Sequence, residues 1–336
     1  MKLKISIFIL IATLFSGISA SGAEEHVLKI FGCVKKPMSL TLKDLEKFQQ
    51  SETQLNDIRK NGAFKGVFSC RGVSLKTLLR FAGIEKTDTD FKKSVDLAVV
   101  VKNRSNDQVV LSWGEIFYKN QDHVLIAIQA YPIYPHKGID HFKDKAAYET
   151  MISTLNRRIR FPMLVISGDL FSDRCIESIS EITVVDLKPE VEGEKSPAVY
   201  SENFKLVGPG ISPVVIDKLP ETSRKTIRAH VVGEGRGYHG THDFTGIPLI
   251  SLLGNIKLGF DTNTVFMVSA PDAYRSLISY GELFLNANGD RILFADQVDG
   301  KTWENGGRFI LVLPDDLMAD REVKAVSKIE IMHIGK

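Results

Sequence analysis

Residues Gly233–Gly254 read Gly-Glu-Gly-Arg-Gly-Tyr-His-Gly-Thr-His-Asp-Phe-Thr-Gly-Ile-Pro-Leu-Ile-Ser-Leu-Leu-Gly. A related stretch, Lys65–Gly83, reads Lys-Gly-Val-Phe-Ser-Cys-Arg-Gly-Val-Ser-Leu-Lys-Thr-Leu-Leu-Arg-Phe-Ala-Gly. Each contains a Gly-Ile/Val-x-Leu turn followed by the apolar face of a short helix, and in the earlier stretch Gly83 can close that helix as a C-terminal cap. The later stretch is rich in glycine before the turn, so we expect a loop there. Aligning the two stretches divides the chain into two halves.

Further segments repeat in the same order in both halves. The clearest are Ser112-Trp-Gly-Glu-Ile-Phe with Ser279-Tyr-Gly-Glu-Leu-Phe, and Asp169-Leu-Phe-Ser-Asp-Arg with Asp316-Leu-Met-Ala-Asp-Arg. Each Ser-x-Gly-Glu segment has the form of a helix capping box, in which the serine and the glutamate satisfy each other's backbone amides. The spacing between matching segments shrinks after Tyr131, which indicates an insertion at about 131–160. We predict two tandem copies of one α+β domain, with short strands and few helices.

Composition indicates where these copies begin and end. Lys2 and Lys4 precede the apolar run Ile5–Phe15, which is too short to span a bilayer, and the small residues Ser21-Gly-Ala follow. We therefore expect a signal peptide at 1–23, a first domain at 24–188, a linker at 189–202 and a second domain at 203–336. The mature protein would be periplasmic and have no membrane span after cleavage. The alternative is a retained N-terminal anchor. The polar segment Gln49–Asn61 is expected to be a loop.

Charge and cysteine content exclude several classes of function. The net charge of +2 gives no reason to expect nucleic acid or a membrane surface as partner. Three well-separated cysteines, Cys33, Cys70 and Cys175, do not form a disulfide framework, and at least one stays unpaired within the chain. No Cys-x-x-Cys occurs, so neither thioredoxin-like chemistry nor c-type haem is supported.

The repeat unit resembles the molybdopterin-binding domain of the sulfite oxidase family. The resemblance rests on the Gly-Val/Ile-x-Leu turn, the Ser-x-Gly-Glu box, Arg160-Phe-Pro-Met-Leu-Val and, most specifically, the closing run Arg321-Glu-Val-Lys-Ala-Val-Ser-Lys-Ile-Glu-Ile. It covers most of the mature chain twice. It implies two sulfite-oxidase-like mixed α+β domains and a pocket for a pterin with a phosphate tail.

Both copies depart from the family at the metal ligand. Catalytic members carry a cysteine, whose thiolate ligates molybdenum, ahead of an aromatic-x-Gly-Val/Ile-x-Leu turn. The second copy has this turn at Phe244, but Val232–Asp243 contains no cysteine; in the first copy Cys70 takes the aromatic position. Because a soft metal prefers thiolate, we expect no molybdenum, whereas molybdopterin or another pterin remains a candidate cofactor. Cys70 beside Arg71 is either a reactive catalytic thiol or a buried structural cysteine.

The glycine-rich segment supplies one group of candidate binding residues, namely Arg236, Tyr238, His239 and His242. Its Gly235-x-Gly-x-x-Gly pattern fits the dinucleotide fingerprint, but no helix is expected to open directly after it. The segment could instead form a nest of amides for an anion, with Arg236 as counter-charge. His239 and His242 are also candidate metal ligands, or simply exposed histidines.

The resemblance adds a second group of candidate residues. Arg174, Arg321 and Lys324 match positions that contact the pterin phosphate in the family. Arg160 and Arg308 precede a buried strand in each copy, and Arg71 lies in the first turn.

These observations lead to one preferred function and two alternatives. We predict a periplasmic protein that binds a small anionic heterocycle, a pterin or molybdopterin-like ligand, as a non-catalytic sensor or carrier for a periplasmic or membrane-bound protein partner. The first alternative is a molybdopterin-dependent oxidoreductase with an atypical metal ligand such as Cys70. The second is a structural interaction module with a vestigial pocket.

Overall fold

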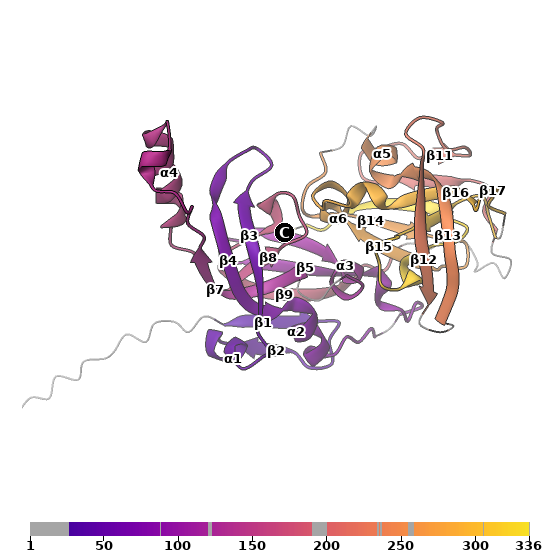
Figure 1. Cartoon of the computed structure of the whole chain (residues 1–336). Helices are drawn as coiled ribbons and strands as arrows, with labels where there is room; N and C mark the ends of the chain where they lie inside the picture. Colours follow the sequence, from indigo (N-terminus) through magenta and orange to yellow (C-terminus); the bar gives the residue numbers. More distant parts are fainter. Residues whose placement is uncertain are drawn as a thin grey trace, which may run out of the picture.

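The computed structural model describes residues 27–87, 89–119, 123–189, 200–233, 235, 237–254, 259–304 and 306–335. The predicted signal peptide at 1–23, most of the predicted linker and Arg236 lie outside the described residues. The chain forms two halves side by side, the first coloured indigo to magenta and the second orange to yellow in Figure 1. Several sheets are combined with few, short helices, so the predicted α+β class is confirmed. The domain boundaries stay a prediction.

The first half is built on two sheets. Its strands are β1 (Leu28–Gly32), β2 (Met38–Leu40), β3 (Ser51–Ile58), β4 (Phe64–Ser74), β5 (Leu97–Asn103), β6 (Gln108–Ser112), β7 (Val124–Pro132), β8 (Met163–Ile166) and β9 (Ile179–Asp186). Its helices are α1 (Leu42–Glu46), α2 (Leu75–Ala82), α3 (Trp113–Phe117) and α4 (Lys145–Leu155), with 3-10 turns η1 (Ser94–Asp96), η3 (Ile139–His141) and η4 (Ser172–Arg174). One sheet has the order β2-β1-β9-β5-β6, in which only β1 and β9 run parallel; the other has the order β3-β4-β7-β8.

The second half repeats this plan. Its strands are β10 (Phe204–Val207), β11 (Val214–Ile216), β12 (Lys225–Gly233), β13 (Gly237–Pro248), β14 (Thr264–Ser269), β15 (Arg275–Ser279), β16 (Leu293–Val298), β17 (Lys301–Thr302), β18 (Ile310–Val312) and β19 (Lys328–His333). Its helices are α5 (Leu249–Gly254) and α6 (Tyr280–Phe284), with 3-10 turns η5 (Gly289–Arg291) and η6 (Ala319–Arg321). The order β11-β10-β19-β14-β15 matches the first sheet of the first half. The strands β12, β13, β16 and β18 match β3, β4, β7 and β8, and β17 is added on the other edge of β16.

One glycine in each half explains the repeated turn. A Cβ atom on Gly72 of β4 would lie 2.0 Å from the Ile126 carbonyl oxygen, and one on Gly246 of β13 would lie 1.9 Å from the Phe294 carbonyl oxygen. Only glycine therefore allows the strand to approach its neighbour this closely. The apolar residues after the turn then enter the core, where Leu75 and Leu249 are fully buried.

Two segments expected to be loops are strands. Most of Gln49–Asn61 is β3, because its alternating side chains place Leu55 and Asp57 inside. The glycine-rich segment is largely β13, which pairs with β12 on one side and with β16 on the other. The pairing with β12 contains a bulge between His230 and Val232. Most glycines of this segment are therefore part of a strand.

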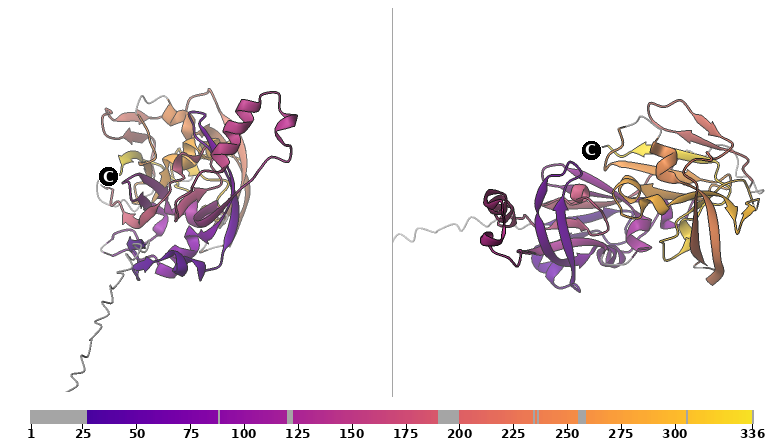
Figure 2. Two further views of the ribbon diagram at one scale, coloured as in Figure 1. Left: turned by 90° about the vertical axis from the view of Figure 1, so that its left-hand side faces the viewer. Right: turned by 45° about the horizontal axis from the view of Figure 1, so that its top comes forward.

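The two halves meet through equivalent faces. Side chains of β5 and β6 pack against those of β14 and β15 in one apolar cluster of Ala98, Val100, Val110, Val265, Met267 and Leu277. The insertion carries α4, which projects from the first half (Figures 1 and 2) and packs against β4 near the buried Leu155 at its end. No helix in the described part of the chain has the length and apolar character needed to cross a membrane.

Candidate ligand-binding site

A pocket of about 520 Å³ opens where the β12–β13 hairpin meets η6 in the second half. Pockets that bind small molecules are commonly about 300–1,000 Å³. Val231, Gly233 and His239 come from the hairpin, and Lys93 closes one side from the first half. The other walls are Asp272, Tyr274, Gly306, Ala319, Asp320, Glu322 and Lys324. The pocket therefore depends on both halves of the chain.

Hydrogen bonds hold one wall of the pocket in place. The Lys93 ammonium donates to Asp320 Oδ1 at 2.6 Å and to the Tyr274 hydroxyl at 3.2 Å. The Tyr274 hydroxyl donates to the Asp320 carbonyl oxygen at 2.5 Å. The Phe91 ring meets the Tyr274 ring edge-on, with centroids 5.5 Å apart. These contacts join the two halves of the chain along this wall.

Glu322 and Lys324 add a carboxyl and an ammonium to the pocket, which the exposed Asp272 carboxylate also lines. The half-buried Glu322 carboxyl forms no hydrogen bond with a described residue. Burial raises the pKa of this carboxyl to about 7, although the nearby Lys324 ammonium opposes the shift. Lys324 is exposed and forms no salt bridge within the described chain. Among the described residues, the pocket therefore offers a carboxyl and an ammonium that take part in no salt bridge.

Of the predicted residues on the β12–β13 hairpin, one lines the pocket and others lie outside it. His239 lines the pocket, whereas Tyr238 is 65% exposed and its hydroxyl lies 2.8 Å from the Thr241 hydroxyl. His242 lies beside Asp299 at 2.8 Å and the His239 carbonyl oxygen at 3.2 Å, and these two hydrogen bonds raise the pKa of its imidazole. Among the described residues, no group of three or more His, Cys, Asp or Glu is placed to hold a metal ion.

Arg174 and Arg321 lie in the interface between the halves and are 0% exposed. Arg174 donates to both Asp169 oxygens at 2.8 Å and to Glu115 at 2.8 Å. Arg321 makes the matching bonds to Asp316 and Glu282 at 2.6–2.8 Å. Both guanidinium groups are therefore occupied by carboxylates and present no surface to a phosphate.

The other predicted arginines are exposed and scattered. Arg71 lines a separate hollow of about 240 Å³. Arg160 lies 3.6 Å from Glu177, and Arg308 donates to the Asp217 carbonyl oxygen at 3.4 Å. None of the three lines the pocket that contains His239 and Lys324.

The described cysteines do not suit a thiolate-ligated metal at this pocket. Cys70 is 0% exposed, and burial, with Asp57 adding to it, raises the pKa of its thiol to about 12. Burial does the same to Cys175, again to about 12. Neither lines the pocket. These two cysteines therefore place no thiolate ligand for a soft metal at this pocket.

Sequence reasoning missed Glu322, Tyr274 and Lys93. Glu322 carried a usable signal, because it replaces Cys175 when the two Asp-Arg-x segments are aligned. A carboxyl in place of the small side chain of Cys175 indicates that this position is more polar in the second copy than in the first. Lys93 carried no such signal, since it reaches the pocket from the other half.

Comparison with known proteins gives little further guidance. No protein-family model matches the chain, and no curated protein matches it. One matching solved structure is the sulfane dehydrogenase SoxCD from Paracoccus pantotrophus, at 13% identity and a TM-score of 0.33 over 93% of this chain and 78% of that chain.

Proposed function

We propose that the protein binds a pterin-like heterocycle with an anionic tail in the pocket between the β12–β13 hairpin and η6. The observation that carries the proposal is the pairing of Glu322 with Lys324 at one pocket, both without a protein salt-bridge partner among the described residues. A pterin has a planar edge rich in N–H groups, and a carboxylate can accept hydrogen bonds from them. Its anionic tail matches an ammonium.

The remaining walls suit a flat ring. Val231 and Ala319 offer apolar contacts, Tyr274 offers an aromatic side chain, and Gly233 and Gly306 leave room beside the backbone. His239 stands at the rim as a second donor for the tail. These features support recognition and orientation of a ligand, and none supplies an activated nucleophile or a thiolate.

We accordingly favour a binding protein, a sensor or carrier, over an oxidoreductase. The proposal includes export to the periplasm and delivery to a periplasmic or membrane-bound protein partner. Cys70, the thiol on which the oxidoreductase alternative depends, is buried away from the pocket.

Fluorescence titration with pterin-6-carboxylate tests the proposal. We expect saturable binding by the wild-type protein and weaker binding by Glu322→Gln and by Lys324→Met. Glu149→Gln and Lys43→Met change exposed residues on α4 and α1 and serve as matched controls. No binding by the wild type would reject a pterin ligand, and equal binding by all variants would reject this pocket.

Analysis of protein purified from a periplasmic extract addresses the catalytic alternative. We expect a fluorescent pterin and no stoichiometric molybdenum. One molybdenum atom per chain would overturn the choice of a non-catalytic binding protein.

A further inference from the structure

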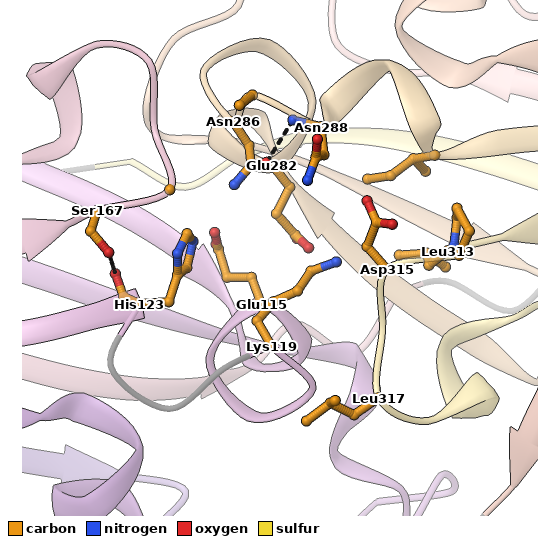
Figure 3. A pocket seen from close by; sticks show the side chains of 14 residues that line it. Glu115, Lys119, His123, Ser167, Glu282, Asn286, Asn288, Leu313, Asp315 and Leu317 are labelled. Carbon is orange, nitrogen blue, oxygen red and sulfur yellow. Dashed lines mark hydrogen bonds between the residues drawn. The ribbon is translucent and has the colours of Figure 1, made fainter. Parts of the chain in front are cut away.

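The interface between the halves contains a second pocket, of about 420 Å³. Glu115, Lys119 and His123 line it from the first half, and Glu282, Asn286 and Asn288 line it from the second. Figure 3 shows the side chains of Glu115, Glu282 and Lys119 pointing into its centre. This pocket is separate from the one proposed to bind a pterin, and its argument does not depend on that proposal.

Two buried networks face each other beneath this pocket and are related by the repeat. Ser112 of the first half donates to Glu282 at 2.6 Å, and Ser279 of the second half donates to Glu115 at 2.7 Å. Each glutamate also accepts a hydrogen bond from the arginine of its own half, at 2.8 Å for Glu115 and 2.7 Å for Glu282. The halves therefore exchange equivalent contacts.

Lys119 and Asn286 are equivalent positions in this arrangement. Each follows the capping serine of its half at the same distance in sequence. The Leu317 amide donates to the Tyr118 carbonyl oxygen at 2.8 Å, and the Leu170 amide donates to the Leu285 carbonyl oxygen at 2.8 Å. Lys119 thus stands beside Asp316, and Asn286 pairs with Asp169 in a β-bridge.

The exchange of lysine for asparagine leaves one network short of a cation. Asp316 and Glu282 face two cations, Arg321 and Lys119, and the Lys119 ammonium lies 2.8 Å from Asp316. Among the described residues, Asp169 and Glu115 form ion pairs only with Arg174. An uncompensated buried carboxylate is unfavourable. Burial and the like charge of Glu282 raise the pKa of Glu115 to about 7, although the single cation beside it, Arg174, opposes the shift.

We propose that the pocket binds a small primary ammonium compound, whose –NH₃⁺ group lies on the Asn286 side, next to Glu115 and Asp169. It would take the place that the Lys119 ammonium holds in the other network. His123 and Asn288 provide further polar groups for the body of the ligand. His123 packs over Gly168, and burial, aided by Arg174, lowers the pKa of its imidazole, so this histidine does not supply the missing charge.

Ethanolamine is the probe, and ethylene glycol is its neutral control of similar size. We expect ethanolamine to bind in isothermal titration and to raise the melting temperature of the wild-type protein, because a ligand that binds only the folded state stabilises it. Ethylene glycol should do neither. Equal responses to the two compounds would overturn the proposal.

Asn286→Lys supplies the cation from the chain itself. We expect this variant to melt at a higher temperature than wild type without amine and to lose the response to ethanolamine. Asn286→Met carries no charge and should show no such rise, and Asn61→Lys at an exposed site should keep the response. If Asn286→Lys does not fold, Asp169→Asn, which removes the anion, should abolish ethanolamine binding. Retained binding in either variant would contradict the proposal.

Discussion

The place where a hairpin meets a 3-10 turn is closed in the first half and open in the second. In the first half, Ser172 donates to Asp57 at 2.6 Å, the Lys60 amide donates to Asp173 at 2.8 Å, and Arg59 donates to the Cys175 carbonyl oxygen at 3.2 Å. At the equivalent place in the second half, between β12–β13 and η6, there is a pocket of about 520 Å³. One fold thus carries both a sealed and an open version of the same junction.

The insertion completes the seal in the first half. Arg157 follows α4 and donates to Asp57 and Glu177, each at 2.5 Å. Its guanidinium group also lies 5.2 Å from the centre of the Phe68 ring. The second half has no equivalent of the insertion, and Lys324 and Glu322 stand where Glu177 and Cys175 stand in the first. The two junctions thus share one framework and differ in the residues that fill them.

Removing the seal should have the largest effect on stability. Arg157→Ala removes the nearer cation of the 2%-exposed Asp57 side chain and leaves only Arg59, at 3.9 Å, so we expect a loss of about 3 kcal/mol in the free energy of unfolding, measured in urea. Arg158→Ala removes an exposed arginine next to it and should change stability little. Equal effects of the two substitutions would show that Arg157 does not close the junction.

The shared framework should respond equally in both halves. Gly72→Ala and Gly246→Ala each force a Cβ atom against a carbonyl oxygen at about 2 Å, so each should cost about 2 kcal/mol of unfolding free energy. Thermal and urea unfolding would measure both. A large effect in one half alone would show that the two halves do not share this close approach.

Glu322→Gln should make the open junction more stable at alkaline pH. The pKa of the Glu322 carboxyl is raised from 4.5 to about 7 in the folded protein, so the fold binds a proton here and loses stability as the pH rises between these values. Relative to wild type, the variant should therefore gain about 1–2 kcal/mol between pH 4.5 and pH 8, with allowance for partial exposure. A pH-independent difference between the two proteins in urea unfolding would contradict this assignment.

Lys324→Met should have the smallest effect, and it should act mainly on the ligand tail. We expect about a fivefold loss, or about 1 kcal/mol, in affinity for pterin-6-carboxylate. The affinity for neutral 6-methylpterin should fall less, because Lys324 acts on that ligand only through the pKa of Glu322. If both affinities fell together, Lys324 would shape the pocket and not bind the anion.

Local sequence signals predicted a good part of the fold. The capping boxes at Ser112 and Ser279 are confirmed, because each serine accepts from the amide of its glutamate and each glutamate accepts in return. The Gly-Val/Ile-x-Leu turns at Gly72 and Gly246 were also predicted, because in each a glycine comes shortly before the apolar residues of a helix. In contrast, β3 was missed because its inward side chains include the charged Asp57, whose partners Ser172 and Arg157 lie far away in sequence.

The site was harder to predict, because a residue type does not reveal its partner. Arg174 and Lys324 are both basic residues in corresponding regions of the two copies, yet the first is buried between carboxylates and the second lines a pocket. Lys93 and Tyr274 belong to different halves and meet only in the folded chain. The role of each basic side chain depends on which carboxylates it meets in the folded chain. Those contacts join residues that are far apart in sequence.

The stoichiometry of ligand binding tests the contrast between the two junctions most directly. Isothermal titration of the full chain with pterin-6-carboxylate should give one site per chain, because Arg157 closes the first junction. The double variant Glu322→Gln, Lys324→Met should bind at least tenfold more weakly than the Glu149→Gln, Lys43→Met control. Two sites per chain, no site, or undiminished binding by the double variant would contradict the account.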